Sequence, residues 1–266
     1  MMLRFCKNVL YLMAVMLVAT GTADAETPFA RQPGGEAEIA LFETCQSYPR
    51  LNGRLLDACG LKFDYFEITA MTDVSLEGYR VVIIGESWLR NLDMSALKKS
   101  RAKIEKYLAG GGRIAAFRNG LDPNAWLPQE LKVKRDAREL RMPVILRKEH
   151  PVFNARHSIA EDKFGFYDPP LKHPISSLKA LCWGGSIINP FINLSPDWTP
   201  LVMGTVEKEG LSESDYKGYA LVEASYGSKG GRILLCEMIP VFSAVERRSD
   251  TGKAFVENML AYLCGE

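Results

Sequence analysis

Five polar or aromatic residues follow the ends of predicted strands, and their side chains suit the binding of a polar ligand. Glu43 ends one apolar run, Glu86 and Trp88 follow a second, and Arg118 and Asn119 follow a third. Carboxylates, a guanidinium and an amide can hydrogen-bond sugar hydroxyl groups, and an indole offers an apolar face to a sugar ring. The set predicts a binding site for a carbohydrate or a cell-envelope glycan.

Two other interpretations of these residues stay open. Glu43 and Glu86 could act as the acid and base of a hydrolase, because glycoside hydrolysis uses a pair of carboxylates. Alternatively, Arg118 forms an ion pair with one of these two glutamates, and the pair only stabilises the fold.

The elements that must position these residues follow an α/β pattern. Strands are predicted at 38–43, 62–68, 79–85 and 113–117. Helices are predicted over about 48–58 and from an Asp93 cap to the glycines at 110–112. A β-hairpin over 219–236 precedes a last helix capped by Asp250 or Thr251. This order predicts a mostly parallel, flavodoxin-like sheet flanked by helices, ending in a hairpin and a helix.

The strand order decides whether the five residues meet. Ligands of open parallel sheets bind beyond the carboxyl ends of the strands, where the strand order reverses. A two-one-three-four order places that crevice between the first and third strands, so we expect Glu43, Glu86 and Arg118 to converge there. Residues 119–200, rich in proline and aromatic residues, are predicted to be an insertion at one edge of the sheet. Residues 37–266 then form one domain.

Residues 1–25 have the features of a secretory signal peptide. Arg4 and Lys7 precede an apolar run over 9–18, and Ala23-Asp24-Ala25 is a small-x-small cleavage pattern. The mature chain is expected to begin at Glu26 with a loose segment over 26–36. The predicted location is the periplasm or the extracellular space, with only transient membrane contact through the signal peptide.

Composition excludes several partners. The formal net charge is +1, and no basic cluster indicates nucleic acid. The histidines and cysteines have no metal-ligand spacing, so neither a metal nor a cofactor is expected. His150-Pro151 is predicted to begin a turn. Most cysteines are expected to be buried small apolar residues, and one bridge among Cys182, Cys236 and Cys264 stays open.

Several segments together resemble a known family. They are YRVVIIG at 79–85, YLAGGGRIAAF at 107–117, EHPVF at 149–153, YGSKGGRILL at 226–235 and ENMLAYL at 257–263. The pattern resembles the class I glutamine amidotransferase-like fold over about 37–120 and 198–264. Within it, the chain is most similar to a secreted, often non-catalytic branch, which includes trehalose-utilisation-type domains and the middle, trimerisation domain of some β-galactosidases.

The resemblance places a catalytic cysteine on a tight elbow after the strand at 113–117. This chain has Phe117-Arg118-Asn119-Gly120 there, with neither cysteine nor serine, and no G-x-C-x-G or G-x-S-x-G motif elsewhere. The resemblance therefore implies no catalytic residues and favours an accessory binding module. It also implies a third class of function, a structural interaction domain that assembles an oligomer.

Overall fold

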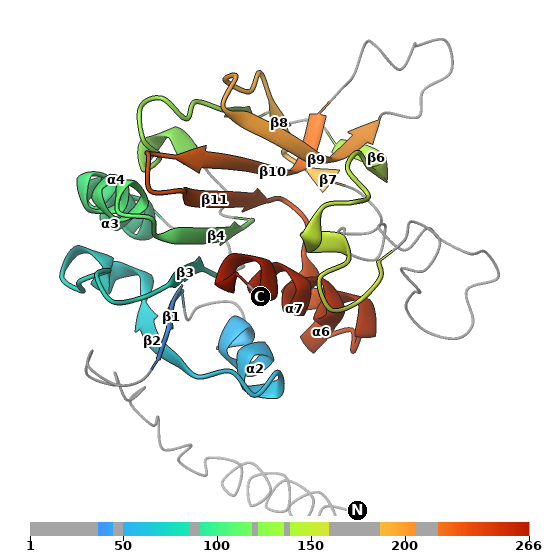
Figure 1. The fold of residues 1–266 in the computed structure, drawn as a ribbon, viewed down its shortest axis with the longest axis horizontal. Helices are drawn as coiled ribbons and strands as arrows, with labels where there is room; N and C mark the ends of the chain where they lie inside the picture. The colour runs from blue at the N-terminus through green and yellow to red at the C-terminus, as the bar shows by residue number, and fades with distance from the viewer. Residues whose placement is uncertain are drawn as a thin grey trace, which may run out of the picture. The chain divides into compact units, whose positions relative to one another are not determined.

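The computed structural model describes residues 37–44, 50–85, 91–118, 122–135, 139–159, 187–205 and 218–265. All of them belong to one compact unit, Gln32–Glu266 (Figure 1). The predicted signal peptide and the segment over 26–36 lie outside the described residues, as do Glu86, Trp88 and Asn119.

The first four strands form the parallel part of the sheet. They are β1 (Ile39–Glu43), β2 (Phe63–Glu67), β3 (Val81–Ile84) and β4 (Arg113–Phe117). Their order is β2-β1-β3-β4, and every neighbouring pair is parallel, which confirms the predicted strand order. All four residues of β3 are buried, as expected of a β-branched run covered on both faces.

The other strands widen this sheet. β11 (Gly231–Cys236) lies parallel to β4, and β10 (Gly218–Tyr226) pairs antiparallel with β11 as the predicted hairpin. Residues of the predicted insertion continue the sheet beyond β10. They form β5 (Lys134–Arg135), β6 (Glu139–Ile145), β7 (Ile187–Ile188), β8 (Phe191–Ile192) and the start of β9 (Trp198–Thr205). The predicted fold class, with its edge insertion and its C-terminal hairpin and helix, is confirmed.

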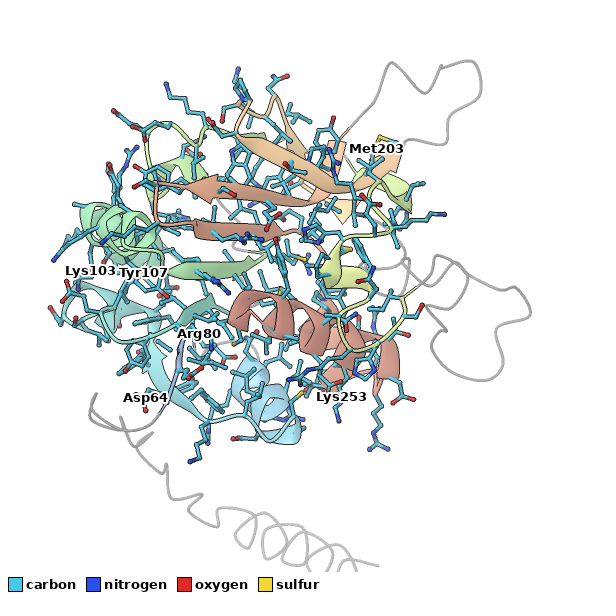
Figure 2. The ribbon with its side chains drawn as sticks, viewed as in Figure 1. Asp64, Arg80, Lys103, Tyr107, Met203 and Lys253 are labelled. Atoms are coloured by element: carbon cyan, nitrogen blue, oxygen red, sulfur yellow. The ribbon has the colours of Figure 1, made fainter. Side chains whose placement is uncertain are left out.

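Helices cover both faces of the sheet. Alternate strand residues point to opposite faces, and the buried apolar residues divide accordingly into two clusters. One cluster includes α2 (Leu51–Ala58), α6 (Pro240–Val245) and α7 (Asp250–Cys264). The other includes α3 (Asn91–Lys99), α4 (Arg101–Ala109) and the 3₁₀ helix η1 (Ile68–Thr72). Side chains fill the space between the sheet and these helices (Figure 2).

Two helix starts differ from the prediction. The helix expected from Asp93 is two helices that meet at Ser100, and Asp93 lies buried in the first turn of α3 instead of capping it. The last helix is capped by Ser249, whose hydroxyl oxygen accepts a hydrogen bond from the Gly252 N–H at 3.2 Å. Asp250 occupies the first turn, where a negative charge also favours the helix dipole.

The described cysteines are thiols. Cys59, Cys236 and Cys264 form no disulfide, so the bridge left open between Cys236 and Cys264 is not formed. Cys45 and Cys182 lie outside the described residues. Burial, together with the nearby Glu257 carboxylate, raises the pKa of Cys59 to about 11. This thiol therefore stays protonated and unreactive at neutral pH.

Candidate functional site

Three charged side chains are buried at the carboxyl ends of three strands in the sheet. Glu43 ends β1, Arg118 follows β4 and Glu237 follows β11, and these residues are 1%, 8% and 5% exposed. Charged residues are rarely buried so completely unless they are paired or used. This edge, beyond the parallel strands, is therefore the candidate site.

Glu43 binds the beginning of α2. Its Oε1 accepts hydrogen bonds from the backbone N–H and the side-chain amide of Asn52, both at 3.0 Å. Burial raises the pKa of Glu43, while the bonds from Asn52 and the N–H groups of Gly53 and Leu51 lower it by a smaller amount. Among the described residues, the second carboxylate oxygen has no partner. Glu43 thus satisfies donors that the first turn of a helix leaves unpaired.

Gly85 leaves room for this contact. It follows β3, and its N–H donates to the carbonyl of Phe42 at 2.8 Å. A Cβ on Gly85 would lie 2.6 Å from the amide nitrogen of Asn52 and 3.4 Å from the Cβ of Glu43. Only glycine therefore lets the Glu43–Asn52 contact sit across the end of β3 without rearrangement.

Arg118 has an unusual backbone conformation at the end of β4. Its φ is +35°, in the region that favours glycine, and its N–H donates to the Cys236 carbonyl at 2.6 Å. A non-glycine residue held in such a conformation costs on the order of 1–3 kcal/mol, and such residues cluster at functional sites. This is the position at which the sequence resemblance expects a nucleophile elbow. The residue at this position has a positive φ, and its side chain is a guanidinium in place of a thiol or hydroxyl group.

The positive charges of Arg118 and Arg135 both affect the pKa of one buried carboxylate, that of Glu237. The side chain of Arg135 forms an ion pair with Glu237, and its guanidinium carbon lies 5.7 Å from the ring centroid of Phe191. The positive charges of Arg135 and Arg118 lower the pKa of Glu237, but burial outweighs them and raises it to about 8. The site therefore contains a carboxyl group that keeps its proton more readily than an exposed one.

The two predicted site residues that the structure describes, Glu43 and Arg118, have different neighbours. Glu43 lies against α2, and the strand residues two and four before it, Leu41 and Ile39, belong to the same cluster as that helix. Arg118 acts on Glu237, whose partner Arg135 packs on Phe191 of the other cluster. Glu86, Trp88 and Asn119 would complete the set but lie outside the described residues.

Sequence analysis missed Glu237 and Arg135. The signal for Glu237 is the same one that selected Glu43, a glutamate directly after a buried apolar run, here Ile233-Leu-Leu-Cys236. Arg135 had no comparable signal, because it lies in the insertion and reaches the site through the pairing of β5 with β8.

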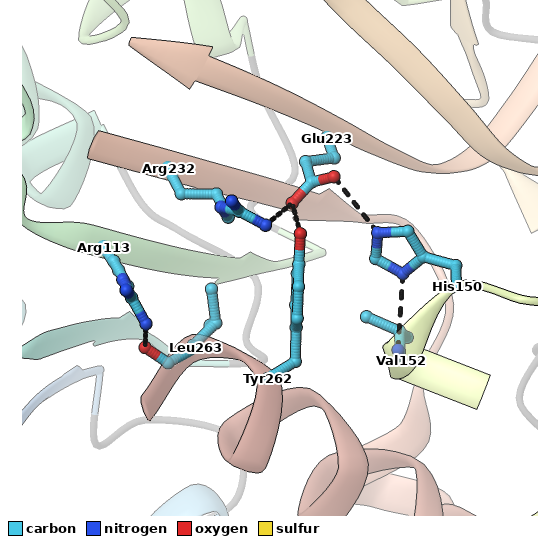
Figure 3. Close-up of polar contacts among 7 residues, drawn as sticks. All are labelled: Arg113, His150, Val152, Glu223, Arg232, Tyr262 and Leu263. Atoms are coloured by element: carbon cyan, nitrogen blue, oxygen red, sulfur yellow. Dashed lines mark hydrogen bonds and ion pairs between the residues drawn. The ribbon is translucent and has the colours of Figure 1, made fainter. Parts of the chain in front are cut away.

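A second polar cluster joins the sheet to α7 (Figure 3). Glu223 of β10 accepts hydrogen bonds from Tyr262 at 2.6 Å and from Arg232 at 3.3 Å, and it contacts Nε2 of His150 at 3.1 Å. His150 Nδ1 accepts from the Val152 N–H and caps the 3₁₀ helix η3 (Pro151–Phe153). This confirms that His150-Pro151 begins a turn. These contacts hold the segment at 150–153 against the sheet.

Metal-binding clusters and membrane-spanning helices are two further features that could indicate a function. Within the described ranges, no group of three or more histidine, cysteine, aspartate or glutamate side chains is placed to hold a metal ion. No helix in those ranges combines the length and apolar character needed to cross a bilayer.

The sequence matches no protein-family model and no curated protein at a significant level. Among solved structures, a GMP synthase component from Thermoplasma acidophilum is similar, with a TM-score of 0.51, 10% identity, and coverage of 85% of this chain and 94% of that one. A cytoplasmic protein from Salmonella typhimurium is similar at a TM-score of 0.48 and 12% identity, over 84% of this chain and 98% of that one. The β-galactosidase from Rahnella sp. R3 is similar at a TM-score of 0.45 and 15% identity. The similarity covers 85% of this chain and 31% of that one.

Likenesses at such identities concern the fold alone, and the two with the lower scores carry no argument about activity. The similarity to the Thermoplasma structure, at a TM-score of 0.51, concerns the arrangement of strands and helices. The chain therefore has an amidotransferase-like α/β fold.

Proposed function

We propose that this chain is an exported, non-catalytic module that binds a polar ligand, a carbohydrate or cell-envelope glycan, at the carboxyl edge of its parallel strands. The observation that carries this proposal is Arg118, buried and with a positive φ, directly after β4, where the resemblance expects a nucleophile. An arginine guanidinium stays protonated and cannot act as a nucleophile, so the acyl-enzyme chemistry of a cysteine elbow has no attacking group there.

The same residues suit ligand binding. A guanidinium presents several N–H donors in a rigid plane, and carboxylates accept hydrogen bonds from hydroxyl groups. In the sequence, Glu86 and Trp88 come two and four residues after β3, and Asn119 comes two residues after β4, so we include these three residues in the proposed site. An indole beside such donors and acceptors is a common platform for a sugar ring.

The burial of Glu43 disfavours the alternative of a hydrolase that uses Glu43 and Glu86. A raised pKa suits a general acid, and burial gives Glu43 that property. However, Glu43 is 1% exposed and its Oε1 is committed to Asn52. A general acid must reach the leaving oxygen of its substrate, so the position of Glu43 fits a helix cap better than a catalytic group.

Export predicts a defined N-terminus. The full chain, expressed in a Gram-negative host, should be recovered from the periplasm and begin at Glu26 or within a residue or two of it, because Ala23-Asp24-Ala25 is the cleavage pattern. Intact-mass spectrometry of the periplasmic fraction measures this directly. An intact Met1 on membrane-bound protein would contradict export as a soluble mature chain.

Arg118→Gln should abolish or strongly weaken glycan binding. We expect a loss of about tenfold or more in affinity on a glycan array and in titration with soluble peptidoglycan fragments, because charge-assisted hydrogen bonds are lost. Trp88→Ala should weaken binding as well, through loss of the stacking face.

The control for these variants is Arg54→Gln. Arg54 is a surface arginine in an ion pair with Glu246 at 2.9 Å, on α2. It should leave binding unchanged. Equal binding by the Arg118, Trp88 and Arg54 variants would reject the proposed site. Release of ammonia from glutamine by the wild-type protein would reject the non-catalytic assignment.

A further inference from the structure

A hollow of about 980 Å³ opens at the other edge of the parallel strands, where β3 and β4 begin. Its walls include the segment at 73–80, residues 102–107 of α4 and the glycines at 110–112. Figure 2 labels Arg80, Lys103 and Tyr107, which line it. This volume lies at the upper end of the range for sites that bind small organic ligands.

The lining carries an excess of positive charge. The lining includes four basic residues, Arg80, Lys103, Lys106 and Arg113, and two acidic residues, Asp73 and Glu77. Lys103 is fully used, because its ammonium group donates to the carbonyls of Met71, Thr72 and Val74 at 2.7–2.9 Å. The charges of Arg80, Lys106 and Arg113 therefore determine which ligands the hollow can attract.

The backbone carbonyls near the hollow do not cancel this charge. Gly110, Gly111 and Gly112 donate their N–H groups to the last carbonyls of α4, at 2.9–3.0 Å. Arg113 donates through Nη1 to the carbonyl of Leu263 at the end of α7. These helix ends are therefore already capped, and their negative partial charges are partly neutralised.

Arg80 and Arg113 both place guanidinium nitrogens near Gly265, the residue that follows α7. A Cβ built on Gly265 would lie 3.3 Å from Nη2 of Arg80 and 3.2 Å from Nη1 of Arg113. The contact of Arg80 with Glu38 is long, at 3.4 Å, and the Arg80 side chain is 47% exposed. Two positive charges near the same residue repel each other, and an anion that contacts both would lower this repulsion.

The ion pairs that compete with a ligand are weak. Lys106 contacts Glu77 at 2.6 Å, but the two side chains are 78% and 73% exposed. Exposed pairs of this kind are screened by water and salt and contribute little. Lys106 can therefore turn to a ligand that carries two negative charges.

We propose that this hollow, which we call the amino-edge pocket, binds a small molecule that carries a phosphate or sulfate group. Arg80 and Arg113 form the fork that contacts the oxyanion, and Lys106 adds a mobile charge. A tetrahedral oxyanion offers acceptor oxygens to donors that approach from different directions, whereas a planar carboxylate offers fewer. This site lies at the opposite end of the strands from Arg118 and does not depend on the proposed glycan site.

Isothermal titration of the mature protein at low ionic strength tests the proposal, with glucose 6-phosphate, glucose 6-sulfate, inorganic phosphate and glucose as probes. We expect both esters to bind at least about tenfold more tightly than glucose. Phosphate binding as tight as the ester would assign the site to the free ion. Preference between the two esters identifies which oxyanion the pocket selects. Failure of every anionic probe to bind would overturn the proposal.

The variant Arg80→Gln tests whether the ester binds in the amino-edge pocket. We expect it to weaken the ester by about fivefold or more, while the matched surface variant Arg54→Gln leaves affinity unchanged. Lys106→Gln should give a smaller loss, because that side chain is more exposed. Arg118→Gln should keep ester binding even where glycan binding is lost. Ester binding that Arg80→Gln leaves unchanged would overturn the assignment to this pocket.

Discussion

Replacing Gly231 by alanine should destabilise the protein by about 3 kcal/mol, since overpacking at a rigid contact has costs of this size. A Cβ at this position would lie 1.9 Å from the carbonyl oxygen of Leu108 and 2.9 Å from that of Tyr226. Both are backbone atoms, so neither can turn aside as a flexible side chain would. Alanine would force α4 away from the hairpin or break the first pair of β11 with β10. Urea unfolding measures the loss through the shift in midpoint.

Gly230→Ala is the matched control for this variant. Gly230 precedes Gly231 in the same turn, and a Cβ there meets nothing within 4 Å. Its φ of +73° still makes alanine unfavourable, by about 1 kcal/mol. The two variants share the hairpin and the added methyl group, but only one has the backbone clash. Equal destabilisation by both would show that turn conformation, and not packing against α4, explains the glycine at 231.

The hairpin shows what sequence can and cannot predict about a turn. The glycines over 227–231 predict a turn because they permit positive φ, and Gly227 and Gly230 do adopt it. Gly231 has a different reason, the approach of Leu108 from a helix far away in the chain. No local pattern carries that contact, because it depends on how α4 packs beside β11.

The parallel strands were predictable for a local reason. A buried parallel strand needs apolar side chains on both faces, so Val81-Val-Ile-Ile84 stands out from the amphipathic helices around it. Once these strands and the helices between them are placed, short connections leave few possible strand orders. The resemblance placed an elbow after this strand, and Arg118 at the end of β4 has a positive φ.

The partners of the site residues were not predictable in this way. A strand end fixes which edge a residue reaches, but the pleat and the neighbouring layer decide which side chain it meets. Glu43 meets Asn52 of α2, and Arg118 acts on Glu237. Arg135 reaches Glu237 only because the insertion pairs with the hairpin through β8. That contact depends on long-range pairing for which the sequence has no periodic signal.

Glu237 should make the folded protein less stable as the pH rises. Its pKa is about 8 in the folded protein, against an ordinary value of 4.5 for a glutamate. Between these values the unfolded chain has released this proton while the folded protein still holds it. The unfolded state then binds fewer protons, so the free energy of unfolding falls with increasing pH. The fall should begin near pH 4.5 and end near pH 8, with a total on the order of 3–5 kcal/mol.

Glu237→Gln removes this titration while keeping nearly the same shape. A neutral amide occupies the site at every pH, so the variant should match the wild type near pH 4.5 and become progressively more stable than it toward pH 8. The difference between the two stability profiles cancels the contributions of other groups, including Glu43, whose pKa is also raised. Urea unfolding across this pH range gives both profiles. A difference that stays constant with pH, or that favours the wild type increasingly as the pH rises, would mean that Arg135 and Arg118 keep Glu237 ionised. The buried carboxyl would then be a salt-bridge partner at neutral pH and not a proton-holding group.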